Sequence, residues 1–211
     1  ARRRCWFVDS KGLVVRRREH LTDVKRPFAH DHLCIDDFSS SVRALKPTAV
    51  IGVSGQAGKF TPRVLSDMAR FNERPVVFAL SNPTSQSECT AEEAYTWTRG
   101  RAVFASGSPF APVTVGGETF TPGQGNNAYI FPGVGLGVIA SRARRVTDAM
   151  FLAAATTLAE MVSEESFRQG CVYPPLTSLR NVSERIAAAV AKVAFEEGLA
   201  GVSEPEDLDS F

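Results

Sequence analysis

The sequence predicts an α/β fold built on a parallel sheet. Three apolar runs of strand length, residues 49–53, 75–80 and 102–105, lack polar alternation, which is typical of strands buried on both faces. Each run ends in a glycine-rich or polar turn, and helical segments alternate with the runs. This repetition of strand, turn and helix is the pattern of parallel α/β domains.

Helix-start signals support the alternation. Thr61 precedes Pro62 as an N-cap and predicts a helix to about Phe71, after a helix that ends before Pro47. Thr90 and Glu93 have the spacing of a capping box.

The second half of the chain is predicted to be mainly helical. An apolar stretch spans residues 128–140, and Thr147 is predicted to cap a helix to about Val162. A final amphipathic helix is predicted to begin at Asn181 or Ser183 and to end at Gly198.

The composition excludes several classes of protein. Of the 211 residues, 44% are hydrophobic and 22% are charged, as in ordinary soluble chains, which argues against a disordered or collagen-like protein. No apolar stretch approaches the roughly 18 residues of a membrane span, so we expect no membrane partner.

The net charge of +1 hides a basic amino-terminal region. Residues 1–26 hold nine basic and three acidic side chains, and the arginine runs 2–4 and 16–18 raise nucleic-acid binding as an alternative. These runs flank a hairpin-like segment with few stacking aromatic residues. We therefore expect no nucleic-acid partner and interpret both runs as solvated surface.

The cysteines give no sign of a disulfide framework or a zinc site. Their spacing favours reduced, mostly buried thiols in an intracellular protein. The four positions are Cys5, Cys34, Cys89 and Cys171. The sequence His30-x-His32-x-Cys34 lies among acidic residues, so a solvated connector is favoured over a metal site.

Polar or glycine-rich residues follow four predicted strands: Asp9, the loop of residues 52–58, Asn82 and residues 106–108. Ligands of open α/β sheets bind outside the carboxyl ends of the strands. The loop of residues 52–58 lies between a strand and a capped helix, where backbone N–H groups favour anions. Turns without a ligand role are the alternative at each position.

The first of these strand ends has the chemistry of a nucleotide site. An acid such as Asp9 commonly binds ribose hydroxyls in dinucleotide folds, and cations there suit a 2′-phosphate. Ser10, Lys11 and Lys25 would form the phosphate seat. A solvated turn at the edge of the sheet is the alternative.

Three asparagines offer neutral hydrogen-bonding groups. The amides of Asn82, Asn126 and Asn127 each carry an acceptor and a donor, which suits a hydroxy acid or a nicotinamide carboxamide. Capping of turns is the alternative. The glycines at 133, 135 and 137 imitate a phosphate loop but lie among apolar residues, so close helix packing is the favoured interpretation.

Five segments resemble the malic enzyme family, in family order. They are FVDSKGL (7–13), FALSNPT (78–84), FASGSPF (104–110), PGQGNNAYIFPGV (122–134) and YPPL (173–176). The resemblance is to the carboxyl-terminal part of NADP-preferring members. It implies a Rossmann-type parallel sheet, incomplete at its N-terminal side, with C-terminal helices. It also implies a partial NAD(P)-binding domain with the following helices over residues 1–200. Residues 201–211, which hold four acids and no base, are predicted to form an acidic tail.

The resemblance implies oxidative decarboxylation of L-malate to pyruvate and CO₂ with reduction of NADP, NAD being the alternative cofactor. It assigns substrate contacts to Asn82, Asn126 and Asn127. It assigns cofactor contacts to Asp9, Ser10, Lys11 and Lys25. The loop of residues 52–58, which favours anions, adds Gly52, Ser54 and Gly55 as further cofactor contacts.

The family's catalytic acid and base, and its Mg²⁺ or Mn²⁺ ligands, match no residue of this chain. We therefore expect no catalytic or metal residue here, and no activity from the chain alone. The resemblance also implies a homotetramer in the complete enzyme. Cytosolic, mitochondrial and plastid forms differ chiefly upstream, so no compartment is favoured. A truncated, non-enzymatic nucleotide-binding or subunit-interaction module is the competing interpretation.

Overall fold

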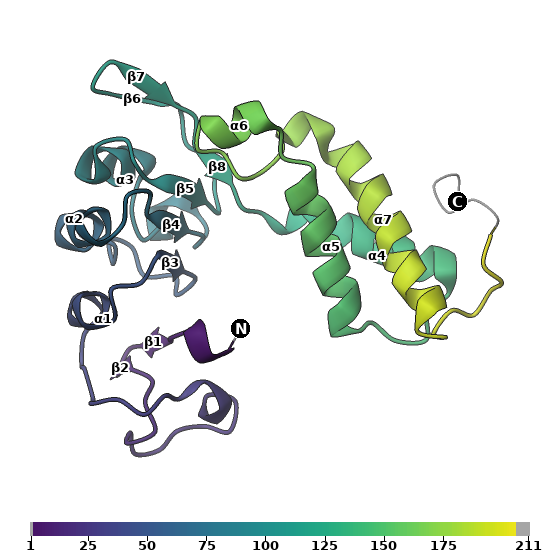
Figure 1. Cartoon of the computed structure of the whole chain (residues 1–211), viewed down its shortest axis with the longest axis horizontal. Helices are drawn as coiled ribbons and strands as arrows, with labels where there is room; N and C mark the ends of the chain where they lie inside the picture. Colours follow the sequence, from purple (N-terminus) through teal and green to yellow (C-terminus); the bar gives the residue numbers. More distant parts are fainter. Residues whose placement is uncertain (1, 206–211) are drawn as a thin grey trace.

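The protein consists of a sheet part and a helical part. The structure, a computed structural model, describes residues 2–205, so residues 206–211 of the predicted acidic tail lie outside the described residues. The sheet part comes first in the chain, and the helices of the second half lie to one side of it (Figure 1). No helix among the described residues is long and apolar enough to cross a membrane.

The predicted parallel sheet is confirmed. Four strands lie in the order β3-β4-β5-β8 and all pairs are parallel. Their bounds are Ala49–Gly52 (β3), Val76–Ala79 (β4), Val103–Ser106 (β5) and Gly123–Gln124 (β8). The register pairs Gly52 with Ala79 and Ala79 with Ser106, so the three predicted strand ends lie side by side at one edge of the sheet.

Three helices cover one face of this sheet (Figure 1). They are α1 (Phe38–Leu45), α2 (Pro62–Phe71) and α3 (Ala91–Thr98). Their apolar sides bury Leu65, Met68 and Tyr95 against Val77 and Phe104 of the strands. Thr61 caps α2, and Thr90 with Glu93 forms the predicted capping box of α3.

The edge strand β3 is open on its other face. Ile51 is 59% exposed and Val53, which follows the strand, is 74% exposed, whereas Val50 is buried against the helices. In parallel sheets, helices normally cover both faces of each strand. The alternating burial of β3 shows that one of its faces lacks this cover. The prediction that residues 49–53 form a strand buried on both faces is therefore wrong for β3, because only the face that packs against the helices is buried.

Two hairpins flank the sheet. The first pairs β1 (Val8–Asp9) with β2 (Gly12–Leu13) in antiparallel orientation. The apolar run at residues 5–8 thus forms only a short strand, and Asp9 lies outside the parallel sheet. The second, β6 (Val113–Val115) with β7 (Glu118–Phe120), was absent from the sequence prediction. Its Phe120 stacks on Tyr95 of α3.

The helical part is built on three packed helices. They are α4 (Phe131–Ser141), α5 (Asp148–Glu160) and α7 (Leu179–Glu196), with a short α6 (Glu164–Arg168) between the last two. Met150, Ala154, Ile186 and Val190 are fully buried in its core. The predicted Thr147 cap is confirmed. Helix α7 begins at Leu179, directly after a 3-10 turn over Leu176–Ser178, and therefore earlier than the predicted start at Asn181 or Ser183.

The glycines of α4 confirm close helix packing. A Cβ at Gly133 would lie 2.7 Å from Ile186 of α7, and one at Gly137 would lie 2.6 Å from the Ala187 carbonyl oxygen. A Cβ at Gly135 would meet nothing within 4 Å. The backbones of α4 and α7 thus approach closely because the glycines carry no side chain.

The four cysteines are free, but the expectation that most are buried is wrong. Only Cys89 is buried, whereas Cys5 and Cys34 are exposed and Cys171 is intermediate. Cys5 and Cys34 lie in the irregular segments around the first hairpin, where little chain covers them. Their exposure therefore reflects the thin cover of this region.

Candidate dinucleotide and substrate site

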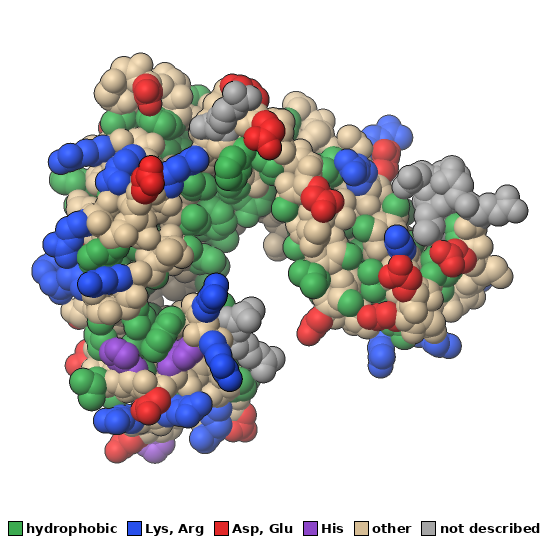
Figure 2. All heavy atoms as spheres, in the orientation of Figure 1, with side chains coloured by type: hydrophobic (Ala, Val, Ile, Leu, Met, Phe, Trp, Pro, Cys, Tyr) green, Lys and Arg blue, Asp and Glu red, His purple; other side chains and the backbone are tan. Residues whose placement is uncertain are grey.

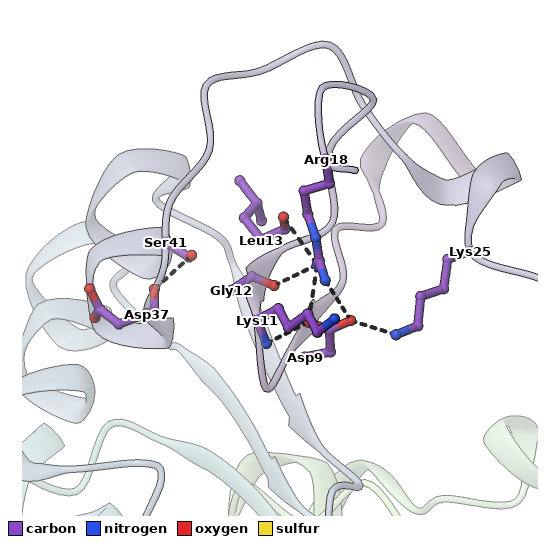
Figure 3. A network of polar contacts seen from close by, with 8 residues as sticks. All are labelled: Asp9, Lys11, Gly12, Leu13, Arg18, Lys25, Asp37 and Ser41. Atoms are coloured by element: carbon purple, nitrogen blue, oxygen red, sulfur yellow. Dashed lines mark hydrogen bonds and ion pairs between the residues drawn. The ribbon is translucent and has the colours of Figure 1, made fainter. Parts of the chain in front are cut away.

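Asp9 is the centre of a basic cluster at the first hairpin (Figure 3). Its carboxylate accepts hydrogen bonds from Lys25 Nζ at 2.5 Å and from the Lys11 backbone N–H at 2.8 Å. Arg18 Nη1 lies 3.0 Å from Asp9 Oδ1. One carboxylate therefore faces two cations, and the exposed Lys11 side chain adds a third next to them. The cluster has a surplus of positive charge.

Arg18 was missed by the sequence analysis, which placed it on a solvated surface. Only 12% of its side chain is exposed. Besides Asp9, its guanidinium donates to the carbonyl oxygens of Gly12 and Leu13 at 3.2 and 3.4 Å. Arg18 therefore fixes the hairpin, and Lys25 lies on the outer side of Asp9 with 44% of its side chain exposed.

The surroundings of Asp9 keep it ionised. Partial burial opposes ionisation, but the hydrogen bonds from Lys25 and Arg18 and from the Lys11 N–H outweigh it. Together they lower the pKa of Asp9 from 3.8 to about 2. At neutral pH Asp9 is thus a charged acceptor and a weak base, which suits binding of ribose hydroxyls.

Asp9→Asn is expected to destabilise the protein at pH 7 by about 1–2 kcal/mol, because Arg18 loses its charged partner. A carboxyl group whose pKa falls on folding stabilises the folded state above its unfolded pKa. This contribution is lost as the pH falls from 3.8 through about 2. The difference in unfolding free energy between the parent and Asp9→Asn should therefore shrink on acidification. Urea unfolding between pH 7 and pH 3 will measure this change.

Asp31→Asn is the matched control for this prediction. Asp31 is 73% exposed and pairs with Arg17 at 3.7 Å, so its loss should change stability by less than about 0.5 kcal/mol. A deficit of Asp9→Asn that is constant across the pH range would contradict the assigned ion pairs.

The glycine-rich loop after β3 is held by the segment that follows β4. The Gly55 N–H donates to Ser81 Oγ at 2.9 Å, and the Ser54 N–H donates to Glu88 Oε1 at 3.3 Å. Gly52 is buried, and a Cβ there would lie 2.3 Å from the Glu88 carboxyl carbon. The candidates Gly52, Ser54 and Gly55 thus form one structural unit.

Asn82 lies directly after this segment. Its side chain is exposed, and its Oδ1 accepts a hydrogen bond from Ser108 Oγ at 2.5 Å. Gly107 makes room for this contact, because a Cβ there would lie 2.8 Å from Asn82 Nδ2. The turn after β5 thus orients the amide of Asn82 and leaves its NH₂ group free to bind a ligand.

Asn126 and Asn127 differ from each other in their surroundings. Asn126 Oδ1 accepts from the Ala128 N–H at 2.9 Å and caps a 3-10 turn. Asn127 is exposed and lines a pocket of about 390 Å³. The other lining residues are apolar side chains and one glycine, which come from α4, from α5 and from the segments directly before these helices.

The turn after β5 connects the two groups of asparagines. Gly125 N–H donates to the Ser106 carbonyl oxygen at 2.9 Å, and Gln124 Nε2 donates to that of Gly107 at 3.3 Å. Since Ser108 also binds Asn82, residues 106–108 hold both segments.

The cofactor candidates form two separate groups. Asp9, Ser10, Lys11 and Lys25 lie on or beside the first hairpin, whereas the loop after β3 belongs to the parallel sheet (Figure 1). Hydrophobic side chains gather in the hollow between the sheet part and the helical part (Figure 2).

Glu88 joins Arg18 as a residue that sequence reasoning missed. Its only sequence signal is an acid directly before Cys89, ahead of the capping box.

Comparison with known proteins supports this description. The family model for the malic enzyme NAD binding domain matches residues 1–195. NADP-dependent malic enzyme 4, chloroplastic, of Arabidopsis thaliana is 56% identical over 211 residues, which is 99% of this chain and 33% of that protein. The NADP-dependent malic enzyme of Vitis vinifera is 54% identical over 98% of this chain and 35% of its own length.

Solved structures give the same result for the fold. The malic enzyme of Pyrococcus horikoshii matches with a TM-score of 0.58 and 28% identity over 78% of this chain and 34% of its own. The malic enzyme of Entamoeba histolytica matches with a TM-score of 0.74 over 97% of this chain and 40% of its own. At 24% identity, the second match supports the fold alone.

The sheet, its strand-end residues and these neighbours define a Rossmann-type α/β domain of the NAD-binding class. The chain belongs to the malic enzyme family and matches its NAD-binding domain. It spans about a third of the length of the curated relatives it matches.

Proposed function

We propose that this chain is part of an NADP-preferring malic enzyme, which converts L-malate to pyruvate and CO₂ while reducing NADP. The observation that carries the proposal is the cationic cluster around Asp9, where Arg18 and Lys25 surround one carboxylate. The relatives above, which are named NADP-dependent malic enzymes, support the same assignment.

The cofactor's adenosine end is assigned to the first hairpin. Asp9 accepts from the ribose, and Ser10, Lys11 and Lys25 bind the 2′-phosphate that separates NADP from NAD. Lys25 is suited to this because its ammonium carries three donors and Asp9 uses only one of them in the structure. Gly52, Ser54 and Gly55 contact the remainder of the dinucleotide.

Malate is assigned to Asn82, Asn126 and Asn127. Neutral amides orient a hydroxy acid without placing a charge beside the transferred hydride. Asn82 offers its NH₂ group and Asn127 its exposed side chain, while Asn126 acts through the turn that it caps.

The residues that the structure describes do not fit a divalent metal ion. No group of three or more His, Cys, Asp or Glu side chains suited to a metal occurs between residues 2 and 205. Mg²⁺ or Mn²⁺ needs several oxygen ligands at once. We therefore assign the ligands of such an ion, together with the catalytic acid and base, to a part of the enzyme outside this chain.

Lys25→Gln in the full-length enzyme tests the phosphate assignment. The variant keeps a polar side chain that can donate a hydrogen bond and removes the charge that a 2′-phosphate needs. We expect the KM for NADP to rise about tenfold, as for loss of one charge-assisted hydrogen bond, and the KM for NAD to change less than twofold.

Lys192→Gln is the matched control, since Lys192 is an exposed lysine of α7 that pairs only with Glu196, at 3.9 Å. It should leave both KM values unchanged. Equal effects of Lys25→Gln on NADP and NAD would contradict the phosphate seat.

The open face of β3 favours a second candidate: a non-enzymatic module that docks onto other subunits. Exposed Ile51 and Val53 would suit a partner surface. The coding region upstream of Ala1 distinguishes the two. A substrate domain encoded there supports the enzyme, and a promoter with a start codon at this point supports the module.

We propose an assembly and a compartment for the complete enzyme as well. A homotetramer of the complete enzyme is the assembly that the family resemblance implies. Several relatives are named chloroplastic and others carry no compartment in their names, so we place the enzyme inside the cell, with the plastid favoured. Malate and pyruvate are its small-molecule partners.

A further inference from the structure

Glu88 is a buried carboxylate that binds the ends of two neighbouring strands. Only 1% of the residue is exposed. It accepts hydrogen bonds from the Ser54 N–H at 3.3 Å, the Ser81 N–H at 3.4 Å and the Ser81 hydroxyl at 2.5 Å. Ser54 follows β3 and Ser81 follows β4, so one side chain joins both strand ends at the ligand edge of the sheet.

The donors around Glu88 are neutral. Within residues 2–205, no lysine, arginine or histidine forms a salt bridge with it. Burying a carboxylate is unfavourable unless hydrogen bonds compensate for the lost water. Here the compensation comes from two backbone amides and one hydroxyl, all of which belong to the two turns. The hydrogen-bonded carboxyl group of Glu88 therefore stabilises one particular arrangement of these turns.

The same segment holds the rest of the glycine-rich loop. Ser81 Oγ accepts from the Gly55 N–H at 2.9 Å while its own hydroxyl donates to Glu88, so Ser81 transmits the position of Glu88 to Gly55. The Phe60 N–H donates to the Glu88 carbonyl oxygen at 2.9 Å. Gly52 leaves the space that the carboxyl group fills.

Ser81 also precedes Asn82, whose amide is held by Ser108. The two turns that Glu88 joins thus carry the assigned contacts to both ligands: Ser54 and Gly55 to the dinucleotide, and Asn82 to malate. A shift of Glu88 would move both sets of contacts together.

We infer that Glu88 is a positioning residue that holds Ser54 directly and Gly55 through Ser81, and so sets this backbone and Asn82 in register with each other. This inference rests on the proposed function. It adds a residue that touches neither ligand and couples the two binding sites.

The experiment uses the full-length enzyme with Glu88→Gln, Ser81→Ala and the double variant. Glutamine keeps the shape but replaces one acceptor oxygen by an NH₂ group, which faces an N–H donor. We expect the Kd for NADPH, from fluorescence titration, and the KM for malate each to rise about tenfold. Ser81→Ala leaves Glu88 in place and should raise the Kd for NADPH about three- to tenfold, by breaking the relay to Gly55.

The double variant separates positioning from stability. If Ser81 relays the position of Glu88 to Gly55, the two substitutions should not weaken NADPH binding independently. The double variant should then bind NADPH no more weakly than whichever single variant has the higher Kd. A purely structural role would lower the thermal midpoint and the yield of active enzyme, and would leave Kd and KM of the folded enzyme at parental values. That outcome, or effects that multiply in the double variant, would overturn the inference.

Two controls complete the design. Glu92→Gln removes the same charge at an exposed position of α3 and should behave as the parent. If Glu88→Gln does not fold, Ser81→Ala decides alone, and an unchanged Kd for NADPH then contradicts the inference. A parent enzyme that does not oxidise malate with NADP would refute the proposed function instead, and NADPH binding would still test the coupling of Glu88 to the loop.

Discussion

The 211-residue chain by itself is expected to show no oxidation of L-malate with NADP and Mn²⁺. Oxidative decarboxylation needs a base to take the hydroxyl proton and an acid to return one, and loss of each group reduces the rate about 10²- to 10⁴-fold. The titratable groups near the assigned contacts do not suit these roles. Asp9 is held ionised, with a pKa of about 2.

The tyrosines of this region are equally unsuited. Burial raises the pKa of both Tyr129 and Tyr173, and the Tyr129 hydroxyl donates to the Pro174 carbonyl oxygen at 2.6 Å. Lys25 is paired with Asp9. We therefore expect proton transfer in the proposed reaction to depend on residues outside this chain.

Formation of NADPH, followed by absorbance at saturating malate, measures this prediction, with the full-length enzyme as the positive control. Circular dichroism must first establish that the isolated chain is folded. Measurable turnover by the folded chain alone would contradict the assignment of acid, base and metal ligands to another part of the enzyme.

Gly137→Ala is expected to destabilise the helical part by about 3 kcal/mol, the upper end of the usual range for overpacking. The new Cβ would lie 2.6 Å from the Ala187 carbonyl oxygen and 2.9 Å from Val190 Cβ. A backbone oxygen cannot rotate away as a flexible side chain can, so α4 and α7 would have to separate. Urea unfolding of the full-length protein, followed by circular dichroism, measures the loss.

Gly135→Ala provides the matched control on the same helix. Nothing lies within 4 Å of the new Cβ. Alanine is favoured over glycine inside a helix, so this variant should be more stable by up to about 1 kcal/mol. If both variants were equally destabilised, the glycines would serve some purpose other than helix packing.

The sheet was predictable because its strands carry a strong local signal. Val50, Val77 and Phe104 lie in unbroken apolar runs of strand length, which are typical of the strands of parallel sheets. Helix starts were predictable for the same reason. Thr61, Thr90 and Thr147 each accept a hydrogen bond from a backbone N–H three residues ahead, which is a local geometry.

Other features depend on contacts between distant segments. Arg18 is a charged residue in a basic run until the hairpin brings it to Asp9 and to the Gly12 carbonyl oxygen. Glu88 has no pattern of its own, and its role depends on the turns after β3 and β4 meeting around it. The β6–β7 hairpin was missed because its strands are short and only partly buried, so they lack clear apolar alternation.

The sequence by itself determined the parallel α/β architecture, the family resemblance and the residues proposed for cofactor and substrate. These depend on apolar periodicity, capping and motif order, all of which are properties of neighbouring residues. Only the tertiary structure decided which side chains form the charged cluster at Asp9, that Glu88 joins two turns, and which glycines of α4 are required for packing. The physical reason is that ion pairs, buried hydrogen bonds and helix contacts are made across space, between residues that the sequence keeps far apart.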